Sequence, residues 1–133
     1  MQVRTPEEVV LAYFESVNCG DWDTWLSLFA DDATLEEPIG KLEGIQALTD
    51  GTHVLSRVYT RFENRLLSFF VSGEHVCAQT HISALTASGE SVEVDVCNIY
   101  LIQQGKIQSQ VNYLDSVHLQ PFLDELKKQG GEV

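Results

Sequence analysis

Residues 29–40 read FADDATLEEPIG, a stretch that predicts the end of a helix, a tight acidic turn, a very short strand and a forced exit at Pro38. Side chains alternate along a strand, so Leu35 and Glu37 are expected on one side and their neighbours Thr34 and Glu36 on the other. This arrangement puts a carboxylate beside an apolar residue on the buried face. Because a buried charge is costly without a partner or a function, Glu37 is the first candidate for a functional residue.

The composition is that of a globular protein with one core. The chain has 133 residues, 44% of them hydrophobic and 21% charged, which suits a single domain spanning residues 1–133. No apolar run approaches the roughly 20 residues needed to cross a bilayer, and the N-terminus lacks the apolar core of a signal peptide. We therefore expect a cytoplasmic protein without a membrane partner.

Charge and cysteine content argue against several other classes of function. The net charge is −12 and only eight residues are Lys or Arg, so a nucleic-acid partner is not expected. The cysteines, Cys19, Cys77 and Cys97, are odd in number and show no C-x-x-C spacing, which indicates buried free thiols rather than disulfides or a zinc site. The histidines show no metal-ligand spacing either. We expect neither a metal nor a cofactor.

The first half of the chain predicts three helices. Thr5 begins TPEE, a capping-box pattern with proline in the first turn, and apolar residues then recur at helical spacing until Gly20 ends the helix. Asp21 caps a second helix, whose apolar face continues to Phe29. A third helix is expected from Gly44 to about Val54, and the first two helices should pack as a hairpin.

The second half predicts four long strands, because the hydrophobic period changes to two. Short glycine-bearing joints make the strands antiparallel neighbours, and a short helix is expected at the end, followed by a frayed tail over residues 129–133. The expected strands cover residues 61–71, 75–87, 91–103 and 106–115, and the last helix covers residues 121–128. Helices followed by a meander predict an α+β fold in which a curved sheet wraps a helical hairpin into a cone with a pocket inside.

Five segments carry a resemblance to a known family. They are AYFESVNCGD at residues 12–21, the opening stretch, VDVCNIY at 94–100, GKIQS at 105–109 and NYLDSV at 112–117. Together they resemble the nuclear transport factor 2-like superfamily, in particular its ketosteroid isomerase branch, and the last segment resembles the SnoaL-like polyketide cyclases. The resemblance covers nearly the whole chain and implies the cone-shaped fold of that superfamily, mainly antiparallel and dimeric.

The resemblance also implies roles for individual residues. Glu37 falls where the isomerases place their carboxylate base, and Tyr13 falls on their oxyanion-donating tyrosine. Asn98 takes the place of their protonated aspartic acid, a side chain that an apolar site keeps neutral so that it can donate a hydrogen bond. An amide still donates a hydrogen bond there without a shifted pKa. Phe29 and Thr52 stand where the isomerases carry supporting tyrosines.

Strand alternation adds expectations of its own. Asn98 shares a face with Val94, Val96 and Tyr100; if that face is buried, the Asn98 amide must be hydrogen-bonded. Tyr13 lies on the apolar face of its helix, so a plain core tyrosine is the alternative to a catalytic one.

Two further candidates come from the strands. We place His81 on the pocket side, where it would polarise a carbonyl or relay a proton, and the alternative is a histidine that is only hydrogen-bonded. Asp115 matches the acidic base that SnoaL-like cyclases carry near the end of the last strand. If Leu114 lines the pocket, alternation turns Asp115 away unless the strand bulges there.

The opposite side of the sheet is expected to bind a second copy of the chain. On this assignment it carries a set of apolar residues, and an apolar outer face normally has a partner. The set is Val76, Ala78, Ile82, Ala84, Val111 and Tyr113.

These observations lead to one main hypothesis and two alternatives. The main one is a cofactor-free enzyme in which Glu37 moves a proton next to the carbonyl of a small apolar substrate, while Tyr13 and Asn98 hold the enolate oxygen in an isomerisation or cyclisation. The first alternative is a non-catalytic module that binds a small apolar ligand. The second is a hydrolase or dehydratase that holds a water among Glu37, His81 and Asn112.

Overall fold

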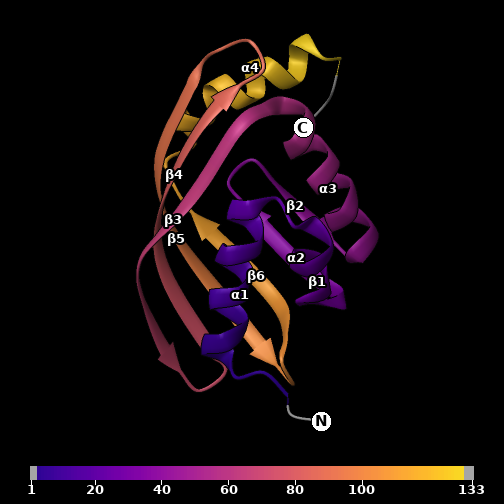
Figure 1. Cartoon of the computed structure of the whole chain (residues 1–133), viewed down its shortest axis with the longest axis vertical. Helices are drawn as coiled ribbons and strands as arrows, with labels where there is room; N and C mark the ends of the chain where they lie inside the picture. The colour runs from indigo at the N-terminus through magenta and orange to yellow at the C-terminus, as the bar shows by residue number, and fades with distance from the viewer. Residues whose placement is uncertain (1–2, 131–133) are drawn as a thin grey trace.

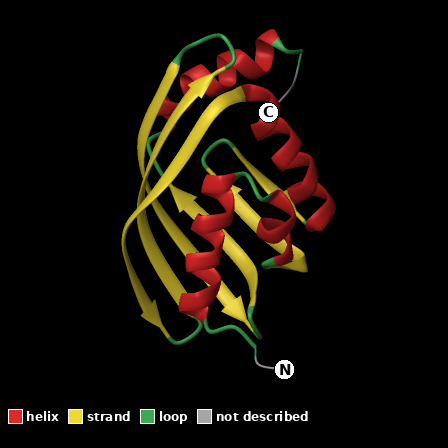
Figure 2. Ribbon diagram, in the orientation of Figure 1, coloured by secondary structure: helices red, strands yellow, loops and turns green. Residues whose placement is uncertain are grey.

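The computed structural model describes residues 3–130, which form one curved six-stranded sheet with helices packed on its inner face (Figures 1 and 2). The strand order is β2-β1-β6-β5-β4-β3, antiparallel throughout except where β1 runs parallel to β6. The helices are α1 (Pro6–Cys19), α2 (Trp22–Ser27), α3 (Ile45–Val58), the short 3-10 helix η1 (Ser116–Leu119) and α4 (Gln120–Lys128). The strands are β1 (Phe29–Glu37), β2 (Gly40–Glu43), β3 (Tyr59–Ser72), β4 (His75–Thr86), β5 (Ser91–Gln103) and β6 (Lys106–Tyr113). The predicted α+β class is confirmed.

Helix α1 begins and ends as its sequence predicts. The Glu8 amide donates to Thr5 Oγ1 at 3.2 Å and the Thr5 amide donates to Glu8 Oε1 at 2.8 Å, which completes the capping box. At the other end Gly20 has a φ of +72°, a left-handed conformation that glycine adopts without steric cost. Val9 and Val10 are fully buried against the sheet, so this face of α1 forms the centre of the core.

The opening stretch folds differently from the prediction at its start. Helix α2 ends at Ser27, and residues 29–37 form one continuous strand without an acidic turn. Asp31 and Asp32 are exposed where the pairing of β1 with β6 shifts register, so an irregular strand segment takes the place of the turn. Ala33 and Leu35 are buried beyond that point, and Glu37 follows on the same side, which confirms the predicted alternation.

Pro38 leads into a hairpin. Strand β2, which the sequence did not predict, pairs with β1 before α3 begins, and α3 extends to Val58 rather than ending near Val54. Gly51 lies inside α3, where an added Cβ would come within 3.1 Å of Leu42 Cδ1. Close packing of α3 on β2 therefore favours glycine at this position.

The meander of β3 to β6 agrees with the prediction to within a few residues. The turn between β5 and β6 consists of Gln104 and Gly105, both with positive φ, as in the hairpin turns whose twist matches that of the strands. α4 begins one residue earlier than expected and follows η1, and it lies over one end of the sheet (Figure 1). Part of the predicted frayed tail, residues 131–133, lies outside the described residues. No helix within residues 3–130 is both long enough and apolar enough to span a bilayer.

The predicted orientation of β4 is wrong. Ala78 pairs directly with Asn98 and Thr80 pairs with Val96, and these residues are buried on the inner face. His81 therefore points to the outer face. Alternation had separated the two sets of side chains correctly, but the set assigned to the outer face is the one that packs into the core: Val76, Ala78, Ile82 and Ala84.

Candidate functional site

Glu37 lies at the end of β1, on the inner face of the sheet. Its side chain is half-buried, and its Oε2 accepts a hydrogen bond from Asn112 Nδ2 at 3.1 Å. Burial raises the pKa of the Glu37 carboxyl above its ordinary value of 4.5, and the hydrogen bond from Asn112 opposes this only in part. A carboxyl with a raised pKa is a stronger base than an ordinary one and is therefore a candidate for proton transfer.

A chain of hydrogen bonds runs from Glu37 into the core. Gln110 Nε2 donates to Asn112 Oδ1 and to the Tyr13 hydroxyl, both at 2.9 Å. Gln110 is fully buried, and it lies two residues before Asn112 on the inner face of β6. The structure thus joins Tyr13, Gln110, Asn112 and Glu37, which we call the polar chain. The sequence analysis missed Gln110, although its spacing of two residues from Asn112 was a usable signal.

Tyr13 lies at the centre of an aromatic cluster. Its ring centroid is 4.8 Å from that of Phe14, 5.3 Å from that of Tyr100 and 5.7 Å from that of Trp25. Burial, as the main cause, raises the pKa of the Tyr13 hydroxyl to about 12, and the charge of Glu37 also raises it. Phe29 joins the same cluster, with its ring centroid 6.2 Å from that of Tyr13. Tyr13 is thus neutral at physiological pH and can donate a proton in a hydrogen bond.

Asn98 is buried in the sheet and is not part of the polar chain. It shares the inner face with Val94, Val96 and Tyr100, as predicted. Its Nδ2 donates to the Ala78 carbonyl oxygen and to Thr80 Oγ1, at 3.0 Å each. These bonds engage both amide hydrogens of Asn98 in holding β5 to β4.

A second apolar cluster lies on the inner face of the sheet, and one of its members lies near Glu37. The half-buried members of this cluster, which we call the apolar set, pack on the buried residues Val94 and Val96. Among them, Tyr59 has a hydroxyl whose pKa is raised mainly by burial and further by the charge of Glu37, so the two groups are neighbours. The set is Ile39, Tyr59, Phe62, Ile82 and Leu114.

A cleft of about 290 Å³ opens beside this apolar set. It lies where the C-terminal ends of α1 and α3 meet the start of β3, and its walls include Trp22, Leu55 and Arg61. Tyr59 and Phe62 also line it, so these two rings separate the cleft from the surroundings of Glu37. The lining of this cleft is mixed, because polar residues such as Asn18 and Ser56 stand among the apolar ones.

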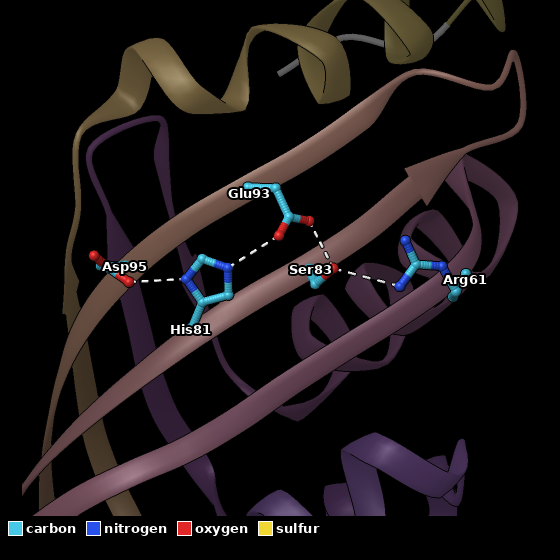
Figure 3. A network of polar contacts seen from close by, with 5 residues as sticks. All are labelled: Arg61, His81, Ser83, Glu93 and Asp95. Carbon is cyan, nitrogen blue, oxygen red and sulfur yellow. Dashed lines mark hydrogen bonds and ion pairs between the residues drawn. The ribbon is translucent and has the colours of Figure 1, made fainter.

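His81 belongs to a different polar network, on the outer face (Figure 3). Its Nδ1 lies 2.8 Å from Asp95 Oδ1 and its Nε2 lies 3.1 Å from Glu93 Oε1. Ser83 donates to the same Glu93 carboxylate at 2.6 Å, and Arg61 Nη1 donates to Ser83 at 3.4 Å. The bonds from Asp95 and Glu93 raise the pKa of His81. The prediction that His81 faces the pocket is therefore wrong, and a water cannot be held between His81 and Glu37, as the hydrolase alternative requires.

Asp115 also lies apart from the polar chain. Strand β6 ends at Tyr113, and Asp115 is exposed, with its Oδ1 accepting a hydrogen bond from the Val117 amide at 3.0 Å. It thereby caps η1. Thr52, at a position where the isomerases carry a tyrosine, is buried and donates to the Thr49 carbonyl oxygen at 2.7 Å. Across residues 3–130, no group of three or more His, Cys, Asp or Glu side chains is arranged to hold a metal ion.

Comparison with known proteins identifies the family and the fold of the chain. The model of the SnoaL-like domain family matches residues 10–110. Among solved structures, a putative polyketide cyclase from Xanthomonas campestris is 21% identical with a TM-score of 0.77, over 91% of this chain and 96% of that one. An NTF2-like protein of unknown function from Burkholderia pseudomallei is 14% identical with a TM-score of 0.80, over 86% and 93%. TerC, co-crystallised with polyporic acid, is 17% identical with a TM-score of 0.80, over 90% and 99%. The chain belongs to the SnoaL-like domain family and has the NTF2-like fold.

Proposed function

We propose that the protein catalyses proton transfer next to the carbonyl of a small apolar substrate, in an isomerisation or a cyclisation. The observation that carries the proposal is Glu37: a carboxyl with a raised pKa, hydrogen-bonded to Asn112 and near Tyr59 of the apolar set. Glu37 takes a proton from the carbon beside the carbonyl, which leaves an enolate. In an isomerisation Glu37 returns the proton at another carbon; in a cyclisation the enolate carbon attacks a second carbonyl of the same substrate.

The similarity to a putative polyketide cyclase supports this class of chemistry, because enolates formed beside a carbonyl are the reactive species in such ring closures. The apolar set suits a substrate with few charges. Burial also keeps the carboxylate poorly solvated and so more basic.

We assign the remaining residues by their contacts. Tyr13 supports Glu37 through Gln110 and Asn112, because its hydroxyl is buried and bonded into the polar chain. Asn98 holds β4 to β5, because both of its amide hydrogens are engaged there. Donation to the enolate oxygen by Asn98 requires its two bonds to open when the substrate binds. The Tyr13 hydroxyl accepts from Gln110, so its own hydrogen is not used in that bond, but the hydroxyl is buried in the core.

Both amide hydrogens of Asn98 are already bonded within the sheet, and this favours a second candidate function, a module that binds a small apolar ligand without turnover. A binding module needs apolar side chains such as those of the apolar set to contact the ligand, but it needs no free hydrogen-bond donor for an enolate oxygen. The two candidates differ in what Glu37 does, because only the enzyme uses the proton affinity of this carboxyl.

Two measurements on the wild-type protein test the proposal. Carbon-13 NMR of labelled glutamate carboxyls is expected to show Glu37 titrating above 4.5, and Glu36, which is exposed, serves as the internal comparison. Proton NMR in deuterium oxide is expected to show exchange at the carbon beside the carbonyl for some members of a panel of small cyclic ketones and enones. Binding of panel members without exchange, together with a solvent-like pKa for Glu37, would favour the binding module.

We also propose that the chain forms a homodimer through the outer face. Four of the six residues that led to this prediction face inward, but Val111 and Tyr113 on β6 point outward. The register of the strands places Ile99 of β5 and Phe70 of β3 in one row with Val111 across the outer face. Tyr113 and Phe70 have exposed fractions of 58% and 65%. Large apolar side chains grouped on one sheet face are typical of an interface between subunits.

Sedimentation velocity tests this interface. The wild-type protein is expected to sediment as a dimer at micromolar concentration and Tyr113→Glu as a monomer, because the substitution places a charge on the outer face, two residues along β6 from Val111. Leu11→Glu is the matched control: Leu11 is a large apolar residue on α1 with an exposed fraction of 45%, so this variant should remain dimeric. A monomeric wild-type protein would exclude the outer face as a stable interface.

A further inference from the structure

Two of the three cysteines lie side by side on the outer face. Cys77 on β4 and Cys97 on β5 are half-buried, and their Sγ atoms are 3.4 Å apart. Cys77 pairs with Ile99 and Cys97 pairs with Gln79, so the two thiols occupy diagonal positions on adjacent strands. The predicted burial of the free thiols is wrong for Cys19, which is exposed. Cys77 and Cys97 are 20 residues apart in sequence, a separation that matches no cysteine motif. The register of β4 with β5 brings them together.

We propose that Cys77 and Cys97 form a reversible dithiol–disulfide pair that reacts with small disulfides such as oxidised glutathione. The thiolate of one cysteine attacks the glutathione disulfide, forms a mixed disulfide and releases one molecule of glutathione. The second thiolate then attacks the protein sulfur of the mixed disulfide and releases the second glutathione. The two cysteines lose two electrons and two protons, and glutathione disulfide is reduced to two thiols.

The contact between the sulfur atoms favours the second step. After the first cysteine has reacted, the second sulfur is already in place, so the mixed disulfide should not accumulate. Burial and the neighbouring Cys97 raise the pKa of the Cys77 thiol, which slows its attack on a disulfide because the thiolate is the nucleophile.

The diagonal arrangement makes the disulfide labile. Diagonal neighbours in an antiparallel pair have Cα atoms about 7–8 Å apart, whereas disulfides usually join Cα atoms about 4.4–6.8 Å apart. Closing the bond therefore pulls β4 and β5 together locally. Strained disulfides have more oxidising potentials than relaxed ones and are easily reduced, as in redox-sensitive proteins.

Equilibration in glutathione redox buffers tests the proposal in the Cys19→Ser variant, which retains only the pair. After an acid quench, mass spectrometry is expected to show a folded protein lighter by two hydrogen atoms in oxidising buffers, with reversal in reducing ones. Cys77 lies between Phe70 and Ile99 in the row of the proposed interface, so a second copy bound there slows the reaction and shifts its equilibrium only to the extent that it binds one redox state more tightly. In the wild-type protein the exposed Cys19 should also carry a glutathione adduct, so the count of free thiols should fall from three to none in the most oxidising buffer.

The variant Cys19→Ser/Cys97→Ser is the matched control, since its single Cys77 can form only a glutathione adduct. The same titration of the urea-unfolded Cys19→Ser chain gives the potential of an unstrained disulfide, and the native pair is expected to be reduced more easily than this reference. Two glutathione adducts on the native pair, or thiols that persist in the most oxidising buffer, would overturn the proposal.

Discussion

The variant Glu37→Gln is expected to lose about 10²–10⁴-fold of the rate of proton exchange and, at neutral pH, to be more stable than the wild-type protein. The rate falls because a neutral amide cannot accept the substrate proton. Stability rises because Gln removes a charge whose burial is unfavourable, while its Oε1 can still accept the hydrogen bond from Asn112. Opposite changes in rate and stability are characteristic of a residue retained for function.

The stability difference has a defined pH dependence. Burial raises the pKa of folded Glu37 above the ordinary 4.5, so the folded state binds its proton more tightly than the unfolded chain does. The contribution of this group to stability is therefore complete below pH 4.5 and is lost as the pH rises through the folded pKa. Glu37→Gln should match the wild type in acid and exceed it at neutral pH.

Urea unfolding at several pH values, together with NMR exchange rates, checks both parts. Glu36→Gln is the matched control, because Glu36 is the exposed neighbour of Glu37 on the same strand and loses the same charge. This control should retain the wild-type rate and show no comparable gain in stability. His81 adds its own pH dependence, which is common to all three proteins and cancels in the differences. A Glu37→Gln variant with an undiminished rate would refute the catalytic role.

Local signals in the sequence predicted much of the fold. The capping box at Thr5, the left-handed Gly20 and the glycine-bearing turns between strands act over a few residues, and the structure contains each of them. Between Ser27 and Ala33 the predicted helix end and turn were wrong, because contacts with a strand distant in the sequence decide the structure there. Apolar residues there fit a helix as well as a strand, and the parallel pairing of β1 with β6 decides for the strand.

The candidate site was predictable only in part, for a related reason. Alternation places Glu37 beside Leu35 and Asn98 beside Val96, but it does not say which side of β4 faces inward, and His81 was misplaced for that reason. Nor does the sequence show which donors are already engaged. The bonds from Asn98 to Ala78 and Thr80 depend on the register between strands, which no residue type specifies.

The variant Gln110→Met is expected to lower the free energy of unfolding by about 1–3 kcal/mol, because it leaves buried polar groups without their partner. Gln110 is the link of the polar chain that contacts both Tyr13 and Asn112, each at 2.9 Å, and Met keeps most of its volume while removing the amide. Loss of this link also releases Asn112 from the orientation in which it donates to Glu37. The exchange rate should then fall by up to about 100-fold, as for other small displacements of reacting groups.

The pKa of Glu37 distinguishes this positioning role from a general loss of stability. Asn112 lowers the pKa of the carboxyl through its hydrogen bond, so weakening that bond in Gln110→Met should raise the pKa further. Carbon-13 titration of Glu37 and the pH profile of exchange should therefore both shift toward alkaline pH. Gln108→Met is the matched control, because Gln108 is a half-buried residue of the same strand that donates to Asp32 at 2.9 Å, outside the polar chain. An unchanged titration of Glu37 in a folded Gln110→Met protein would mean that Tyr13 and Gln110 only fill the core, and that Asn112 holds the carboxylate unaided.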